Sequence, residues 1–282
     1  FLPGLIIDKY NEYLSVQTFS AGMDSRLTLI CDVLVSIFSP RGIVERNESP
    51  LRSLEEIPAR KGILRGTVEM TIIELHDLKF RIDLLEGQKT GFFLDQRENR
   101  TALRPFAKEA TVLDCFCNEG GFGLYAAHYG SKSVSGVDSS EFAIEKSKVN
   151  ATLNNLRNIS FHCADVFETL LSEIKQNRKY DLVVLDPPSF TKNKKTVATA
   201  TKGYKELNTN ALKIMNSGGV LATASCSHHI SEETFLNIIN DSAVKAERKI
   251  RLLEFGGAAP DHPVLPSMPE TKYLKFALIG VE

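Results

Sequence analysis

The chain has 282 residues, of which 43% are hydrophobic and 24% charged, and 34 basic residues nearly balance 35 acidic ones. This composition is typical of a globular protein of about two domains, and it excludes a disordered or fibrous chain. The longest apolar stretch, Leu27 to Phe38, is too short to span a membrane. The five cysteines form no CxxC pair, so neither a disulfide framework nor a metal site is expected, and a reducing cytoplasm fits best.

Residues 1–88 are predicted to form a small α+β domain. Apolar runs at residues 5–7 and 13–16 lie on either side of a polar turn, which predicts a β-hairpin. Apolar residues at helical spacing then predict one helix, which Pro40 ends: Leu27, Ile30, Leu34, Ile37 and Phe38. Further strands are expected at residues 43–44, 67–75 and 79–85, the last two turning at His76-Asp77.

Residues 89–282 are predicted to form a second, α/β domain, because candidate strands and helices alternate along them. The candidate strands are Thr111–Phe116, Ser133–Val137, Ile159–Cys163, Tyr180–Leu185, Gly219–Ser225, Ile250–Phe255 and Tyr273–Val281. The candidate helices include Ser140–Asn154, Tyr204–Met215 and Glu232–Ala246. This alternation predicts a parallel sheet covered on both faces, whose ligands bind at the carboxyl ends of the strands.

Three of these strands end in residues that suit a nucleoside cofactor. The glycine-rich turn at residues 116–123 follows Asp114, but it matches neither GxGxxG nor a P-loop, and a plain tight turn explains it nearly as well. Asp138 ends the second strand, where an acidic side chain can accept both ribose hydroxyls. Asp165 follows the third strand, where it could meet an adenine amino group or, about as readily, cap the next helix.

The fourth strand is followed by Asp186-Pro187-Pro188-Ser189-Phe190. Two prolines make a rigid turn without backbone donors, and such a turn can present a carboxylate to the exocyclic amine of a planar base. Phe190 could stack on that base, which contributes about 1–3 kcal/mol where such stacking occurs. A purely structural Pro-Pro turn is the alternative, and the aspartate directly before it makes that alternative weaker.

The fifth strand is followed by Cys226, between Ser225 and Ser227. A thiolate at this edge could attack carbon 6 of a pyrimidine and turn carbon 5 into a nucleophile. The alternative is a buried, inert thiol, as is expected for Cys31 and Cys163. For Cys226 alone this alternative is slightly favoured, whereas the nearby Asp-Pro-Pro turn favours the reactive interpretation.

Two basic segments border the predicted site. One stretch without acidic residues contains Lys192, Lys194, Lys195, Lys202 and Lys205. A second set is expected on one face of a helix: Arg97, Arg100, Arg104 and Lys108. Charge runs are usually solvated surfaces, but two of them beside one cleft favour phosphate contacts and therefore a polyanionic partner.

Together these motifs resemble the class I S-adenosylmethionine-dependent methyltransferases and, more narrowly, the RlmI-type 23S rRNA (cytosine-5-)-methyltransferases. The resemblance covers essentially the whole chain and is most specific in the run Gly87-Gln-Lys-Thr-Gly-Phe-Phe-Leu-Asp-Gln-Arg97. Other matching runs are Leu2–Tyr10, Asp114–Phe122, Asp186–Phe190, Gly203–Lys205, Ser225–Ser227, Asp261–Val264 and Pro269–Lys275. The resemblance implies a Rossmann-like seven-stranded sheet with an antiparallel last strand, preceded by the small α+β domain.

The resemblance also implies S-adenosylmethionine as cofactor and large-subunit rRNA as partner, with no metal and no membrane. Cofactor contacts are expected from Phe93, Gln96, Arg97, Asp114, Phe116, Asn118, Gly120, Asp138, Ser139, Asp165, Val166 and Asp186. Cys226 matches the nucleophile of the family, and Asp186 would grip the cytosine while the adduct forms. Contacts to the RNA are expected from Pro187, Pro188, Phe190, Lys192, Lys194 and Lys195. The base for product release stays open between His228, His229, His262 and water.

Two other functions stay open at this point. Guanine N-methylation suits the same Asp-Pro-Pro turn and would make Cys226 structural, whereas a non-catalytic RNA-binding or assembly module would bind no S-adenosylmethionine. The family also has an N-terminal PUA domain, an RNA-binding module, and this sequence begins where that domain would end. We expect either a shortened chain or a member without the module. The small first domain could guide RNA or form a homodimer.

Overall fold

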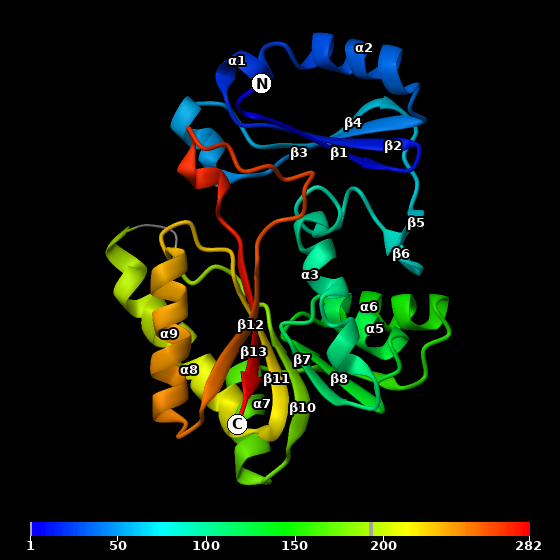
Figure 1. Ribbon diagram of the computed structural model, residues 1–282. Helices are drawn as coiled ribbons and strands as arrows, with labels where there is room; N and C mark the ends of the chain where they lie inside the picture. The colour runs from blue at the N-terminus through cyan, green and yellow to red at the C-terminus, as the bar shows by residue number, and fades with distance from the viewer. Residues whose placement is uncertain (1, 192–193) are drawn as a thin grey trace. The chain divides into compact units, whose positions relative to one another are not determined.

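The computed structural model describes residues 2–191 and 194–282. The chain divides into two compact units, Phe1–Phe93 and Leu94–Glu282, each with its own sheet and its own hydrophobic core (Figure 1). This division lies a few residues beyond residue 88, the end expected for the first domain.

Within the described residues, the first unit has a four-stranded sheet, one long helix and a separate two-stranded hairpin (Figure 1). Its elements are β1 (Leu5–Tyr10), β2 (Tyr13–Thr18), α1 (Ala21–Asp24), α2 (Leu27–Phe38), β3 (Gly42–Asn47), η1 (Pro50–Glu55), β4 (Arg60–Gly66), β5 (Thr71–Leu75) and β6 (Leu78–Ile82). The sheet order is β1-β2-β3-β4, with β2 and β3 parallel and the other neighbours antiparallel. The predicted first hairpin, helix and β5–β6 turn are confirmed, whereas β4 was not predicted.

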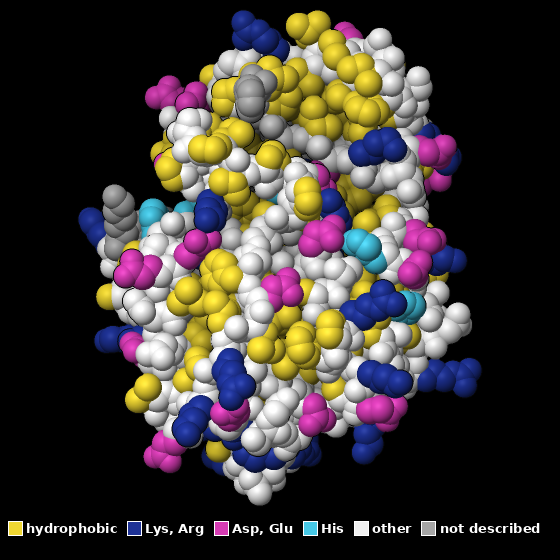
Figure 2. Space-filling model, in the orientation of Figure 1, with side chains coloured by type: hydrophobic (Ala, Val, Ile, Leu, Met, Phe, Trp, Pro, Cys, Tyr) yellow, Lys and Arg dark blue, Asp and Glu magenta, His cyan; other side chains and the backbone are white. Residues whose placement is uncertain are grey.

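Helix α2 packs on this sheet with only part of its predicted apolar face. Leu27, Cys31 and Leu34 are buried in the core with side chains of β2 and β3. Ile37 and Phe38 were expected on the same face, but both are exposed. Figure 2 shows hydrophobic side chains gathered over the surface of this unit. The exposed large apolar residues of α2 are Leu29, Val33, Val35, Ile37 and Phe38.

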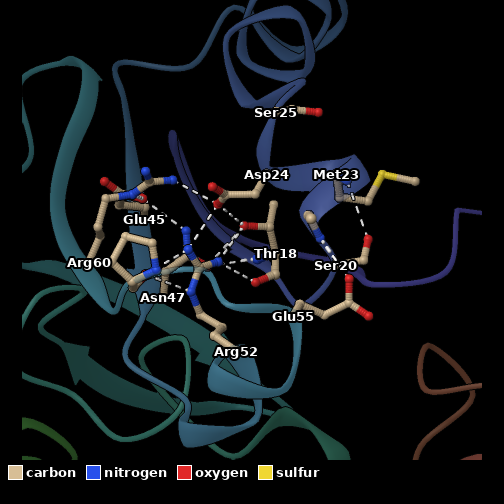
Figure 3. A network of polar contacts seen from close by, with 12 residues as sticks. Thr18, Ser20, Met23, Asp24, Ser25, Glu45, Asn47, Arg52, Glu55 and Arg60 are labelled. Carbon is tan, nitrogen blue, oxygen red and sulfur yellow. Dashed lines mark hydrogen bonds and ion pairs between the residues drawn. The ribbon is translucent and has the colours of Figure 1, made fainter.

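A buried polar network around Arg52 connects the strands and helical turns of the first unit (Figure 3). The Arg52 guanidinium is almost fully buried and donates to the carbonyl and hydroxyl oxygens of Thr18 at 2.5 and 2.8 Å. It also donates to Asp24 at 2.9 Å, and Asp24 accepts further hydrogen bonds from Thr18 at 2.9 Å and from Arg60 at 2.7 Å. Because each buried charge keeps a partner, the network holds β2, α1, η1 and β4 together without an uncompensated ion.

Over the described residues, the second unit is an α/β domain around a seven-stranded sheet, as predicted. Its elements are η2 (Leu94–Gln96), α3 (Arg97–Thr101), α4 (Arg104–Ala107), β7 (Thr111–Cys115), α5 (Gly121–His128), β8 (Ser133–Asp138), α6 (Glu141–Leu153), β9 (Ile159–Cys163), α7 (Val166–Lys175), β10 (Tyr180–Leu185), η3 (Lys194–Thr196), α8 (Val197–Lys213), β11 (Met215–Ser225), α9 (Glu232–Lys245), β12 (Ile250–Gly256), η4 (Pro269–Thr271) and β13 (Lys275–Val281). The strand order is β12-β13-β11-β10-β7-β8-β9. β13 runs antiparallel to β11 and β12, which confirms the predicted antiparallel last strand.

Helices cover both faces of this sheet (Figure 1). Val183 and Leu185 of β10 belong to the core shared with α7, α8 and α9, while Leu182 and Val184 belong to the core shared with α4 and α5. This alternation is the period of a strand buried on both faces, and it fixes the carboxyl end of β10 firmly.

In the part of the chain that the structure describes, none of the helices has the length and apolarity that a bilayer crossing requires.

The segment before β7 differs from its prediction. It was expected to be one helix with a basic exposed face, but it forms two short helices, α3 and α4. Pro105 lies in the first turn of α4, and its missing N–H group cannot continue the preceding helix. Arg100 is only 4% exposed and lies 5.9 Å from the ring centroid of Phe122. The predicted basic helical face is therefore wrong.

Candidate active site

The carboxyl ends of the five parallel strands β7 to β11 lie along one edge of the second unit's sheet. The turn after β7 holds three residues in the left-handed region, Phe116, Asn118 and Gly120, with φ of 61°, 48° and 85°. This conformation costs a residue with a side chain roughly 1–2 kcal/mol. Because strained backbone of this kind clusters at functional sites, the turn favours ligand binding over a plain connection.

Asp114, near the end of β7, is a buried carboxyl group beneath this turn. Its Oδ2 accepts a hydrogen bond from the Gly123 amide at 2.7 Å. A Cβ at position 123 would lie 2.9 Å from Oδ2, so glycine permits this close approach. Among the described residues, Asp114 Oδ1 has no hydrogen-bond partner. Burial raises the pKa of Asp114 to about 7; the Gly123 amide opposes this rise, and the charges of Asp186 and Asp138 add to it.

This raised pKa makes the ionised Asp114 a cost to folding. The cost is absent below the unfolded pKa of 3.8, grows as the pH rises, and is complete above about 7. We expect Asp114→Asn to increase the free energy of unfolding at pH 8 by roughly 3–4 kcal/mol and to leave it nearly unchanged at pH 4. Thermal unfolding at both pH values measures this difference. Equal effects at pH 4 and pH 8 would contradict it.

Asp138 joins the glycine-rich turn to the end of β8. Its Oδ2 accepts from the Asn118 amide and its Oδ1 from the Ser140 amide, both at 2.9 Å. Each carboxylate oxygen has two lone pairs, so both retain capacity for a further donor such as a ribose hydroxyl. The position of Asp138 is therefore compatible with its predicted cofactor role, which stays a prediction.

The turn after β9 holds Asp165, and the structure confirms the capping alternative for it. Asp165 is the N-cap of α7, and its Oδ1 accepts from the Glu168 amide at 3.0 Å. Val166 is buried in the hydrophobic core, whereas Asp165 and Ser139 are exposed. Cys163 at the end of β9 is exposed, so its predicted burial is wrong. The cofactor contacts of Ser139, Asp165 and Val166 stay predictions.

Asp186, directly after β10, is held by a side chain from the first turn of the unit, 90 residues earlier in the sequence. The Gln96 amide donates to Asp186 Oδ1 at 2.9 Å, and Asn99 donates to Gln96 Oε1 at 2.6 Å. Gln96 is buried and Asp186 is half-buried. The Asn99–Gln96–Asp186 chain thus orients the carboxylate that the sequence placed at the site.

Two of the predicted cofactor residues have other contacts. Arg97 pairs with Asp261 and with Glu98. Phe93 is the last residue of the first unit, where Lys89 Nζ lies 4.4 Å from its ring centroid. The cofactor roles of Arg97 and Phe93 therefore stay predictions.

The Asp-Pro-Pro turn presents one proline to solvent and buries the other. Pro187 is buried and Pro188 is exposed. The ring of Phe190 lies 4.7 Å from that of Tyr204 and 6.3 Å from that of Phe167, against the core of the unit. Its stacking on a base therefore stays a prediction.

The basic stretch after this turn is only partly described. Lys192 lies outside the described residues, Lys194 begins η3, and Lys195 is exposed. Farther along, Lys202 is exposed and Lys205 pairs with Asp241 at 2.6 Å. On the face shown in Figure 2, basic and acidic side chains are interspersed over the second unit.

Cys226 follows β11 and is partly exposed, in contrast to the buried Cys115 and Cys117. A polar network holds the two residues on either side of it: Ser225 Oγ donates to the Tyr204 hydroxyl, and Ser227 Oγ lies 3.1 Å from the same hydroxyl and 2.9 Å from Ser189 Oγ. The network connects the segment that carries Cys226 to α8 and to the turn after β10. The backbone that carries the thiol is therefore held on both sides at the sheet edge.

The sequence did not identify two residues that contact this segment, Tyr204 and Lys275, whose ammonium donates to the Ser227 carbonyl at 2.6 Å. Tyr204 is completely buried in α8, and Lys275 is the buried first residue of β13. The sequence offers only faint signals for them. Both residues lie in runs that carry the resemblance, and Lys275 is a single charged residue at the start of an otherwise apolar strand. Of the histidines named for product release, His228 has Nδ1 3.0 Å from the Glu270 carbonyl, and His262 has Nδ1 2.9 Å from Asp261.

The fold and this edge define a class I methyltransferase, and comparison with known proteins gives the family. The model of the S-adenosylmethionine-dependent methyltransferase family matches residues 63–275, and the chain belongs to this family. A protein of Tolumonas auensis named ribosomal RNA large subunit methyltransferase I is 40% identical, over 99% of this chain and 71% of the relative. A protein of the same name from Aliivibrio fischeri is 39% identical, over 97% of this chain and 70% of the relative.

Solved structures agree with this fold. A candidate S-adenosylmethionine-dependent methyltransferase from Streptococcus mutans aligns with a TM-score of 0.85 and 22% identity, over 98% of this chain and 71% of that one. The tRNA m1G37 methyltransferase of M. jannaschii aligns with a TM-score of 0.69 and 17% identity, over 99% of this chain and 76% of that one. At these identities the likeness extends to the fold alone.

The residues at the edge fit S-adenosylmethionine, the cofactor of this family. Its amino group and ribose hydroxyls require hydrogen-bond acceptors. Asp114 Oδ1 is a buried acceptor without a partner among the described residues, which is a costly arrangement that a bound donor would relieve. Asp138 adds a carboxylate with spare lone pairs. Among the described residues, no group of histidine, cysteine and carboxylate side chains could hold a metal ion.

Proposed function

We propose that the protein methylates carbon 5 of a cytosine in large-subunit ribosomal RNA through a covalent adduct with Cys226. The observation that carries the proposal is the arrangement at the sheet edge, with a partly exposed thiol after β11 and the oriented Asp186 carboxylate after the adjacent β10. The relatives named ribosomal RNA large subunit methyltransferase I support the choice of RNA. The predicted RNA contacts of Pro187, Pro188, Phe190, Lys192, Lys194 and Lys195 belong to this proposal.

In the first step, the Cys226 thiolate adds to carbon 6 of the cytosine and forms an S–C6 bond. The π electrons of the C5–C6 bond shift, so that carbon 5 becomes nucleophilic. Negative charge spreads toward ring nitrogen 3 at the same time. As a carboxylate, Asp186 would accept a hydrogen bond from the exocyclic amine; when protonated, it would donate its proton to nitrogen 3 and so neutralise the charge. Gln96 keeps the Asp186 side chain in place.

The cofactor would be held by the turn after β7 and by the carboxylates beside it. Asp114 Oδ1 would accept from its amino group, Asp138 from the ribose, and Gln96 and Arg97 would lie near its methionine part. When bound, S-adenosylmethionine supplies an electrophilic methyl group to carbon 5. The remaining contacts we assign to it are Phe93, Phe116, Asn118, Gly120, Ser139, Asp165, Val166 and Asp186.

Release of the product requires the carbon 5 proton to leave. A base takes that proton, the electron pair re-forms the C5–C6 double bond, and the S–C6 bond breaks to return the Cys226 thiolate. In this chain the residue after Pro187-Pro188 is Ser189, whose hydroxyl lies 2.9 Å from Ser227 Oγ. No second thiol stands at that turn, so a histidine or water completes the step.

Nucleoside analysis of the product tests the proposal. The protein is incubated with unmodified large-subunit rRNA and S-adenosylmethionine labelled in the methyl group, and the RNA is digested to nucleosides. We expect the label in 5-methylcytidine. Label in a methylated guanosine would contradict cytosine-5 chemistry and favour the N-methylation that the same Asp-Pro-Pro turn could serve.

A further inference from the structure

Lys275 is a buried lysine beside the segment that carries Cys226. It is 1% exposed, and its backbone pairs with that of Ser225 across the β11–β13 ladder. Its ammonium donates to the Ser227 carbonyl at 2.6 Å and to the Tyr273 carbonyl at 2.8 Å. Lys275 thus contacts both neighbours of Cys226: its backbone pairs with Ser225, and its ammonium binds the carbonyl of Ser227.

Nothing described near Lys275 neutralises this ammonium at close range. Among the described residues, no carboxylate lies within ion-pair distance of its Nζ, and its hydrogen-bond acceptors are two neutral carbonyls. An ammonium has three donors, so one remains beyond these two bonds. Because a buried charge is costly without compensation, an anion at the adjacent Cys226 would be favoured there.

The charged and titratable groups around this pair come from several elements. Burial lowers the pKa of Lys275 to about 8, while the charges of Cys226 and Glu232, at the start of α9, oppose that decrease. Glu232 itself pairs with Lys272 at 2.8 Å. From α8, Tyr204 faces Cys226, and burial raises the pKa of its hydroxyl, so it stays neutral. The imidazole of His228 is bound to the Glu270 carbonyl.

We propose that Lys275 is a positioning residue that stabilises the thiolate form of Cys226 and fixes the Ser225–Ser227 segment that presents it. The proposal rests on the proposed function for the role of the thiolate in methyl transfer. Lys275 transfers no proton in this role: below its pKa its charge favours the thiolate before the attack on carbon 6 and again when the thiolate is expelled. No role for Lys275 was predicted from the sequence.

The test measures alkylation of Cys226 by iodoacetamide between pH 5.5 and 9.5, with each cysteine followed by peptide mass spectrometry. Only the thiolate reacts, so the rate reports thiol ionisation. We expect Lys275→Met to shift the Cys226 profile to higher pH and to slow its alkylation at pH 7 roughly tenfold. Lys275→Arg, which retains the charge, should restore most of the rate. Cys163, exposed at the end of β9, is the control in the same sample.

Two outcomes would overturn the proposal. One is an unchanged Cys226 profile in a Lys275→Met protein whose thermal unfolding and circular dichroism match the wild type. The other is an equal shift at Cys163, which would assign the change to the fold as a whole. The wild-type protein gives a check that requires no variant, because Cys226 should ionise at lower pH than Cys163. Alkylation requires neither RNA nor methyl transfer, so these results are independent of whether cytosine is the substrate.

Discussion

Replacing Cys226 by alanine is expected to lower the rate of rRNA methylation by at least about 10³-fold. Alanine removes the sulfur that forms the S–C6 bond, and without that bond carbon 5 of cytosine is not nucleophilic enough to accept the methyl group. Cys226 is partly exposed, so its removal leaves no large cavity and the fold should persist. Transfer of labelled methyl groups to rRNA, in single turnover, measures the loss.

The matched control is Cys163→Ala. Cys163 is the last residue of β9, at the same edge of the sheet, and its thiol is exposed. It should keep nearly full activity. If Cys226→Ala kept the wild-type rate, the covalent mechanism would be excluded and Cys226 would be structural, as guanine N-methylation requires.

The second large effect is expected for Asp186→Asn, which should lower the methylation rate by about 10²–10³-fold. The substitution conserves the shape of the side chain and its bond to Gln96 can be retained through the amide oxygen. It removes the carboxyl group that accepts from the exocyclic amine and that can give a proton to nitrogen 3 as negative charge enters the ring. Single-turnover rates at saturating RNA measure this effect, and cofactor affinity, measured separately by calorimetry, divides the loss between binding and chemistry.

Asp181→Asn is the matched control on the same strand. Asp181 lies at the opposite end of β10, where it accepts hydrogen bonds from the Thr111 amide and from Asn216, both at 2.8 Å. Its replacement should affect thermal stability and leave the single-turnover rate within about threefold. Comparable rate losses in the two variants would show that Asp186, like Asp181, acts only by stabilising the fold. Asp186 would then have no role in the mechanism.

Much of the fold could be predicted because the strands of the second unit are short apolar runs between turn residues. β9 and β10 have the predicted bounds, and β7 differs by a single residue. β4 was missed because only Ile63 and Leu64 are large apolar residues among its seven, and charged residues occupy three other positions. The segment 97–108 has helical charge spacing, but Pro105 divides it and the burial of Arg100 could not be inferred from spacing.

The site residues that directly follow a strand could be predicted from the sequence. Residues that contact them from a distant segment of the chain could not. Asp114, Asp138, Asp186 and Cys226 all stand at the carboxyl ends of strands, where parallel sheets bind ligands. Lys275 contacts the carbonyl of Ser227 across 48 positions of sequence, and only the antiparallel pairing of β13 with β11 brings them together. Hydrophobic periodicity carries no information about such a contact.

The central claim, a covalent bond between Cys226 and cytosine, is tested most directly with RNA in which 5-fluorocytidine replaces cytidine. Fluorine stands where the proton must leave, so the C5–C6 double bond cannot re-form and the thiolate cannot be expelled. We predict that the wild-type protein forms a complex with this RNA that survives denaturing electrophoresis, requires S-adenosylmethionine, and links the RNA to the peptide that contains Cys226. Absence of this complex with an RNA whose unsubstituted form is methylated, or its formation by Cys226→Ala, would contradict the mechanism.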